Sequence, residues 1–230
     1  MKYEAKNVGG IATSRPSGLP WTSITQTSAI ARAYDACDSC HLITEAEWLT
    51  IAHNVVNVAS NWSGGSVGSG YIYSGHNDNN PSSSLAASTS DSDGYYGTGN
   101  SSGNQRRTLT LSNGEVIWDL SGNVEEWTSG QISGGQPGAS GWNYREWNSV
   151  EGTGSLSPNP FRSFGNSTAN TWTRSKGIGS LYSNSDDTSL RGFRRGGYWS
   201  RGSFAGVFTL EVFRPPASPF TSIGFRVAHD

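Results

Sequence analysis

Between Ser60 and Gln105 the chain consists almost entirely of residues that form turns, chiefly Gly, Ser, Asn and Asp. Tyr71-Ile72-Tyr73 is an apolar island within this stretch. Connections inside compact domains are rarely longer than about 12–15 residues, and longer ones are usually functional or disordered. A compact fold can keep such a segment only if aromatic side chains or bound ions anchor it. The sequence therefore predicts few regular elements and long loops.

Aromatic residues supply such an anchor and argue against disorder. The 230 residues include 9 Trp, 9 Tyr and 8 Phe, and each buried aromatic side chain removes roughly 150–250 Å² from water. A folded chain of this length buries roughly 70–75% of the surface of its unfolded state. We therefore expect one domain over residues 1–230, in which Gly, Ser and Asn serve turns with unusual backbone angles.

Charge and hydropathy exclude several classes of protein. Sixteen Lys and Arg against 18 Asp and Glu give a net charge of -2, which does not supply the cationic surface that follows a nucleic-acid backbone. No apolar run reaches the roughly 18 residues of a membrane helix, and the first residues lack the apolar core of a signal peptide. We expect neither nucleic acid as a partner nor insertion into a membrane.

Two helices are predicted in the N-terminal part, after a short strand at residues 2–6. Residues 27–36 carry Ala and Ile at helical spacing. The second helix, residues 45–59, is the clearer one, because Thr44 precedes Glu45 and Glu47. A threonine N-cap followed by acidic residues suits the positive end of a helix dipole.

Strands are predicted in the rest of the chain. Asn113-Gly114 lies between the apolar segments 109–111 and 115–120, which is a strong hairpin signal. Residues 122–128 form an aromatic-anchored segment, and residues 129–190 are again rich in Gly, Ser, Asn and Pro and read as irregular. Further strands are expected at residues 190–199, 205–213 and 223–228.

Three sequence stretches resemble the formylglycine-generating-enzyme family in order and spacing. They are Leu42-Ile43-Thr44-Glu45-Ala46-Glu47-Trp48, Trp118-Asp119-Leu120-Ser121-Gly122-Asn123-Val124-Glu125-Glu126-Trp127-Thr128, and Arg195-Gly196-Gly197-Tyr198-Trp199 with Ile223-Gly224-Phe225-Arg226-Val227-Ala228. Each motif alone is weak, but the three in order span nearly the whole chain. The resemblance implies an α+β fold of the C-type-lectin-like, formylglycine-generating-enzyme variety.

The resemblance does not extend to the residues that carry the chemistry of that family. Its enzymes use two cysteines just after the Arg-Gly-Gly segment, and the corresponding positions are Arg201 and Gly206. No cysteine follows Cys40, so a thiolate nucleophile or soft metal ligand is missing there. The related iron enzymes need clustered histidines, whereas the four histidines here are scattered. We expect no enzyme and no cofactor for catalysis.

The C-terminal part, residues 191–228, resembles the variable region of diversity-generating-retroelement variable proteins. In these proteins a reverse transcriptase misreads template adenines, so that selected codons are randomised. The constant frame here is similar at Gly196-Gly197, Trp199, Gly202, residues 205–210, Val212, Pro215-Pro216 and residues 223–226. The positions between these frame residues, which the resemblance implies to be variable and ligand-binding, are Tyr198, Ser200, Arg201, Phe204, Glu211, Phe213, Arg214, Phe220 and Ser222.

The genetic code offers a permissive check on this set. Replacing the two adenines of an Asn codon can yield Tyr, Ser, Arg or Phe but never Glu, so Glu211 alone fails and either has another template codon or is not variable. Alternation along a strand places Phe208, Leu210 and Val212 on one face and Thr209, Glu211 and Phe213 on the other. We expect a buried frame face and a displayed variable face. The alternative is that the phenylalanines belong to the core.

The motif at residues 119–126 is rich in oxygen at close spacing. In the related enzymes this segment chelates calcium, and the resemblance implies Asp119 and Glu126 carboxylates with the Gly122 and Val124 carbonyls as ligands of a structural calcium. The alternative is a hairpin turn with solvated acids. Glu125 stands where the family commonly has an aromatic residue.

Two weaker features remain open. A second metal site would combine oxygens from the long polar stretch, namely Asn77, Asp78, Asp91, Asp93 and the Tyr95 carbonyl, and its alternative is a solvated loop. Cys37 and Cys40 form a CxxC motif without a second metal-binding half. A local disulfide or two free thiols is the expected state of this pair.

These observations predict a non-enzymatic ligand-binding protein that displays a retroelement-diversified surface on a rigid scaffold. Its expected partner is a protein or another cell-surface macromolecule, and display outside the cell or on a virion is favoured. Two alternatives are a metal-dependent oxidase of the superfamily and a structural surface or virion protein without a diversified face.

Overall fold

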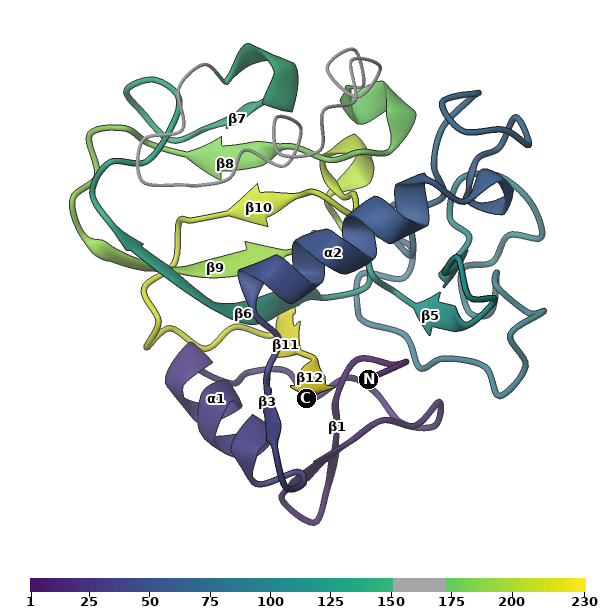
Figure 1. Ribbon diagram of the computed structural model, residues 1–230, viewed down its shortest axis with the longest axis horizontal. Coiled ribbons are helices and arrows are strands. Elements are labelled where there is room, and N and C mark those ends of the chain that lie inside the picture. Colours follow the sequence, from purple (N-terminus) through teal and green to yellow (C-terminus); the bar gives the residue numbers. More distant parts are fainter. Residues whose placement is uncertain (151–172) are drawn as a thin grey trace.

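A six-stranded mixed sheet organises the fold in the computed structural model, which describes residues 1–150 and 173–230 (Figure 1). In spatial order its strands are β11 (Ile223–Phe225), β6 (Glu125–Ser133), β9 (Leu190–Arg195), β10 (Leu210–Glu211), β8 (Leu181–Ser183) and β7 (Asn143–Arg145). Strands β11 and β6 are parallel, as are β10 and β8, and the other neighbours are antiparallel. Residues 190–230 thus supply three strands to this sheet, interleaved with earlier ones.

Two α-helices pack beside the sheet, α1 (Gln26–Tyr34) and α2 (Glu45–Val56), and Figure 1 shows α2 crossing it. The start of α2 is as predicted, because Thr44 and Glu47 form a complete capping box. Its apolar stripe is buried, and the Trp48 indole N–H donates to the Val207 carbonyl at 2.8 Å. The helix ends at Val56, short of the predicted residue 59, and a 3₁₀ turn, η1 (Ala59–Asn61), follows.

Three small ladders complete the described strands. They pair β1 (Lys6–Val8) with β2 (Ile11–Thr13), β3 (Cys40–Leu42) with β12 (Val227–His229), and β4 (Thr108–Thr110) with β5 (Val116–Trp118). The pairing of β4 with β5 confirms the hairpin predicted around Asn113-Gly114. The strand predicted at residues 2–6 is wrong, because β1 begins only at Lys6. The preceding residues bond singly to other parts of the chain, as when the Ala5 N–H donates to the Phe225 carbonyl.

The predicted C-terminal strands are shorter in the structure. β9 stops at Arg195 because Gly196 and Gly197 turn the chain with φ of 84° and 77°. The strand expected at residues 205–213 contracts to β10, because residues up to Thr209 form a turn closed on the Gly206 carbonyl. The stretch 129–190, expected to be irregular, includes β7 and β8, while its residues 151–172 lie outside the described residues.

The long polar stretch is held by an arginine. The Arg107 guanidinium is buried and donates to the carbonyls of Leu85, Ala86 and Tyr96 at 2.7–3.2 Å. It also makes two hydrogen bonds to the Asp119 carboxylate, at 2.8 and 2.6 Å. A guanidinium presents several donors in a fixed plane, so one side chain fixes separate turns of the loop.

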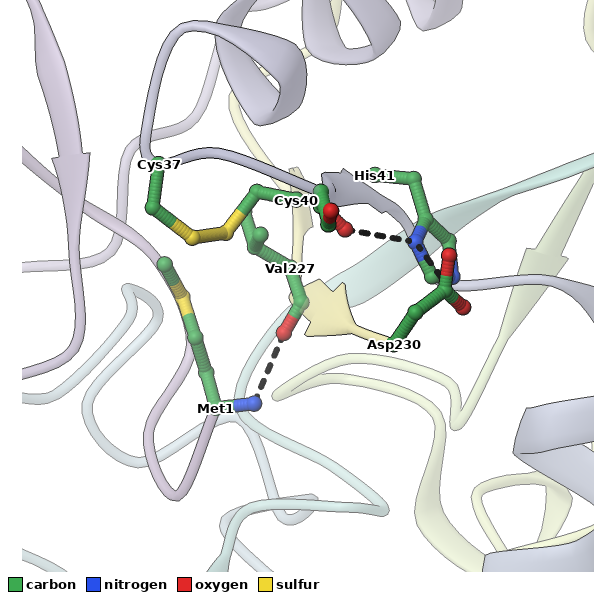
Figure 2. Close-up of a disulfide and its surroundings, with 7 residues drawn as sticks. Met1, Cys37, Cys40, His41, Val227 and Asp230 are labelled. Atoms are coloured by element: carbon green, nitrogen blue, oxygen red, sulfur yellow. Dashed lines mark hydrogen bonds and ion pairs between the residues drawn. A yellow bond between two sulfur atoms is a disulfide. The ribbon is translucent and has the colours of Figure 1, made fainter.

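The segment between α1 and β3 is closed by a disulfide between Cys37 and Cys40, the bonded state of the pair (Figure 2). The Met1 amino group donates to the Val227 carbonyl at 2.7 Å beside it. Among the described residues, no helix combines the length and the apolar character needed to cross a membrane.

Candidate functional site

Aromatic side chains gather at the β7–β8 edge of the sheet. Tyr144 in β7 and Tyr182 in β8 are directly opposite in the antiparallel register, with ring centroids 4.5 Å apart. Opposite residues on paired strands project to the same face. The Phe204 ring lies 4.1 Å from Tyr144, while Phe213 lies 5.9 Å from Tyr182 and 4.9 Å from Trp142. Two residues predicted to be variable therefore meet three aromatic residues from outside the predicted variable region.

Guanidinium groups extend this cluster on both sides. Arg201 lies over the Tyr198 ring at 4.4 Å and over the Tyr144 ring at 5.5 Å. Arg214 lies over Phe213 at 5.0 Å and over Phe220 at 4.4 Å. Arginine planes stack well on aromatic rings, and each contact contributes about 0.5–2 kcal/mol, more where water is excluded.

These contacts form one unbroken chain of side chains, which we call the aromatic–arginine face. Its members are Trp142, Tyr144, Tyr182, Tyr198, Arg201, Phe204, Phe213, Arg214 and Phe220. Phe220 is 45% exposed and the others are half-buried. The structure thus brings together six of the nine residues predicted to be variable, although they are spread over 23 positions of the chain.

The remaining three predicted residues do not share this contact chain. Ser200 is exposed and lies between Trp199 and Arg201 in the sequence. Glu211 and Ser222 are only 1% and 3% exposed, so their prediction as displayed residues is wrong. Glu211 lies in β10, and the side chains of Arg194, Arg201 and Tyr144 contact its carboxylate. Thr209, expected on the displayed face, precedes β10 and is buried, and its hydroxyl donates to the Phe204 carbonyl.

A buried charge cluster lies beneath the aromatic–arginine face. Arg194 pairs with the carboxylates of both Glu125 and Glu211, and Arg201 pairs with Glu211 at 3.0 Å. The Tyr144 hydroxyl donates to Glu211. The cluster therefore ties β6, β9 and β10 to the rings above. It also gives a physical role to Glu125, which pairs with Arg194.

Burial and charge set the protonation of this cluster. Burial, reinforced by the Glu211 carboxylate, raises the pKa of Glu125 to about 7. Burial acts to raise the pKa of Glu211 as well, but Arg194 and Arg201 outweigh it and the pKa of Glu211 is lowered. Burial and the neighbouring Glu211 carboxylate raise the pKa of Tyr144, so that its hydroxyl stays a donor.

Two frame glycines allow the backbone to pack closely below the face. A Cβ on Gly206 would lie 2.3 Å from the Gly179 nitrogen, and one on Gly197 would lie 2.9 Å from the Ala205 Cα. Gly197 also has a φ of 77°. Both positions thus require glycine for steric reasons.

Arg201 and Gly206, which the sequence resemblance sets at the thiol positions, both contact other parts of the fold. Arg201 belongs to the charge cluster, and Gly206 lies against Gly179. The two cysteines are bonded to each other in a different part of the fold. His76 is buried between Gln105 and the Pro81 carbonyl, and His41 pairs with Glu47 at 2.9 Å.

The predicted calcium loop is arranged around two arginines. Asp119 receives two hydrogen bonds from Arg107, and Glu126 receives two from Arg226, at 3.0 and 2.6 Å. Both pairs are buried. The Gly122 N–H donates to the Gly196 carbonyl, and the Val124 N–H donates to Glu4. Calcium at this loop stays a prediction, and the guanidinium groups supply the positive charge that the prediction assigned to the ion.

The residues predicted for the second metal site make other contacts, and this site stays a prediction. No three His, Cys, Asp or Glu side chains converge as metal ligands in residues 1–150 and 173–230. Asp91 instead pairs with Lys2 and accepts from the Trp118 indole, whereas Asp78 lies beside His76. The Tyr95 carbonyl accepts from Thr98. Asn77 and Asp93 complete the predicted set, and Asn77 is buried near His76.

Sequence reasoning missed Trp142, Tyr144 and Tyr182 as members of the face. They lie in the stretch taken as irregular, where the local signal is the alternation of Trp142 and Tyr144 within a polar segment. The pairing of β7 with β8, which sets Tyr144 opposite Tyr182, depends on contacts distant in sequence.

Comparison with known proteins finds similarity among solved structures alone. No protein-family model matches the chain, and no curated protein matches it. Among solved structures, a Major Tropism Determinant U1 variant is similar with a TM-score of 0.43 and 15% sequence identity. The match covers 92% of this chain and 42% of that chain, so this chain spans less than half the length of that structure.

Proposed function

We propose that this protein is a non-enzymatic binding module whose aromatic–arginine face contacts a macromolecular ligand, with a protein as the favoured partner. The observation that carries the proposal is the unbroken contact chain from Tyr198 to Phe220. Aromatic and arginine side chains dominate the energetics of protein interfaces. Their rings offer a large contact area at low cost in conformational entropy.

The support beneath the face suits this role. The charge cluster fixes Arg201 and Tyr144 from below, and the glycine frame keeps the backbone closely packed. A preorganised surface loses less entropy on binding, which favours affinity. The scaffold that we propose is the C-type-lectin-like fold of the formylglycine-generating-enzyme variety, with the three motifs of the sequence as its support.

Diversification belongs to the same proposal. The exchangeable positions are then Tyr198, Ser200, Arg201, Phe204, Phe213, Arg214 and Phe220, without the buried Glu211 and Ser222. A genomic test is direct: a near-identical copy of the 3′ coding sequence, differing at adenines, should lie beside a reverse-transcriptase gene. Display outside the cell or on a virion is the setting in which such diversity would serve.

Selection from two displayed libraries tests the binding proposal. The first randomises the seven exchangeable positions, and the second randomises exposed residues elsewhere, such as Val8, Ile11, Leu19 and Tyr34. Both are selected against the same immobilised protein, for example lysozyme. The first library should yield folded binders and the second should not. Equal enrichment from the two libraries, or an unfolded first library, would contradict the proposal.

Comparing the free energies of unfolding of phenylalanine variants distinguishes residues of the face from residues of the core. Phe208→Ala removes a ring that is 1% exposed and should cost about 3–5 kcal/mol. Phe204→Ala and Phe213→Ala remove half-buried rings and should each cost less than half as much. If either variant unfolds as readily as Phe208→Ala, that residue belongs to the core and not to the face.

A further inference from the structure

An open hollow of about 610 Å³ lies at the disulfide, and both Cys37 and Cys40 line it. The two cysteines connect the end of α1 to the start of β3. Figure 1 shows these elements at the opposite end of the molecule from β7 and β8, which carry part of the aromatic–arginine face. The hollow is therefore a feature separate from that face.

The two cysteines differ in accessibility. Cys37 is exposed, whereas Cys40 is only 6% exposed and packs in an apolar cluster with Leu42 and Val227. Cys40 is also the first residue of β3, which is held by its ladder with β12. Cys37 is thus the cysteine that a thiol from solution can reach, and Cys40 stays in place when the bond between them opens.

The charges around this hollow are negative. Asp38 and Asp230 line it, and both are exposed. His41 lines it too, but this imidazole already pairs with Glu47 at 2.9 Å and lies 4.0 Å from Asp230 (Figure 2). A single imidazole cannot balance three carboxylates, so the hollow keeps a net negative charge.

The neighbouring helix adds no positive charge. Arg32 in the last turn of α1 is neutralised by Asp35 at 2.9 Å, and no Lys or Arg of the described residues lines the hollow. Helix α1 ends at Tyr34, which sets the negative end of its dipole three residues before Cys37. Such surroundings attract a thiol that stands beside positive charges and repel an anionic one.

Opening the disulfide adds a second reason for the same preference. A partner thiolate that attacks the Cys37 sulfur forms a new S–S bond and expels Cys40 as a thiolate, which takes a proton from water. The partner sulfur is oxidised and the Cys40 sulfur is reduced. Burial disfavours a thiolate at Cys40 and makes it a slow leaving group. Positive charges on the partner offset this penalty as the bond breaks.

We propose that Cys37 is a thiol–disulfide exchange site for a cysteine in a basic peptide segment. The Tyr34 ring, which is 64% exposed, lines the hollow and offers a surface on which a Lys or Arg of that segment can stack. The product is a covalent link between the two chains. The link lasts until Cys40 attacks the Cys37 sulfur and releases the partner thiol. The site makes no use of the aromatic–arginine face, so this proposal and the proposed function fail separately.

Exchange kinetics of the intact protein test the site. The probes are the blocked tripeptides Lys-Cys-Lys and Glu-Cys-Glu, compared at pH 8 and at equal thiolate concentration. The basic peptide should open the disulfide about tenfold faster at low salt, and a salt concentration of about 0.5 M should reduce the ratio to about twofold. Acid quenching, alkylation and peptide mapping should find the peptide on Cys37. Equal rates at low salt, or the peptide on Cys40, would overturn the proposal.

Two variants with the same change of charge show whether the effect is local. Asp38→Asn removes a carboxylate that lines the hollow and should slow the basic peptide about threefold. Glu115→Gln removes an exposed carboxylate outside the hollow and should react like the unaltered protein. If both variants react at the same rate, the preference reflects the charge of the whole protein and the site is refuted.

Discussion

Replacing Arg194 by methionine should destabilise the protein strongly, because it leaves two carboxylates without their shared partner. The side chains of Arg194, Glu125 and Glu211 are 3%, 1% and 1% exposed. Removing one member of a buried ion pair typically costs about 3–5 kcal/mol. For a domain of this size each kcal/mol lowers the melting temperature by about 2–4 °C. Arg194→Met should therefore melt roughly 6–20 °C below the unaltered protein.

Arg32→Met is the matched control for this experiment. Arg32 pairs with Asp35 at 2.9 Å, but both side chains are more than 40% exposed, and exposed pairs contribute about 0–1 kcal/mol. Calorimetry and urea denaturation at pH 7.5 measure both variants. Adding Glu125→Gln to Arg194→Met removes one of the uncompensated charges and should restore part of the loss. If Arg194→Met is no less stable than Arg32→Met, the charge cluster does not hold the fold as described.

Three further predictions concern pH, capping and calcium. The pKa of Glu125 rises on folding from 4.5 to about 7, so the folded state binds a proton more tightly than the unfolded state. The free energy of unfolding should therefore fall by about 3 kcal/mol as the pH increases from 4.5 to about 7. Glu125→Gln should flatten this pH dependence in denaturation curves. Thr44→Ala should lower the free energy of unfolding by about 1 kcal/mol, because it removes the cap that accepts from Glu47. The melting temperature should be the same in calcium as in EDTA, since Asp119 and Glu126 already have guanidinium partners. A higher melting temperature in calcium would support the predicted calcium site.

Local signals in the sequence predicted the elements whose cause is local. The capping box at Thr44 and the Asn113-Gly114 turn depend on residues within a few positions of each other, and both are present. The extent of β10 could not be predicted in this way. Its length depends on β8 and β9 as neighbours and on the turn at Gly206. Alternation alone also does not reveal that Arg201 and Tyr144 cover the Glu211 side chain.

In the candidate site, too, the sequence predicted residues with local signals and missed those that depend on contacts distant in sequence. The frame positions pointed to Tyr198, Arg201, Phe204 and Phe213, which the structure joins through ring contacts. Tyr182 and its neighbours in the face were beyond reach, because strand pairing across distant segments positions them. Paired charges were missed for a similar reason, since a carboxylate in a sequence does not reveal whether an arginine or a metal ion will neutralise it.

Arg201 contacts the Tyr198 ring at the surface and the buried carboxylate of Glu211. A substitution at position 201 therefore changes the charge of the interior as well as the surface. With Arg194 and Arg201 present, the two carboxylates of Glu125 and Glu211 are electrically balanced. Exchange of Arg201 for serine or tyrosine would leave one negative charge in excess. Because the pKa of Glu125 is already about 7, a single hydrogen ion taken up by that carboxyl can replace the lost cation. If the face is diversified as proposed, such a proton would spare variants at position 201 a compensating second mutation.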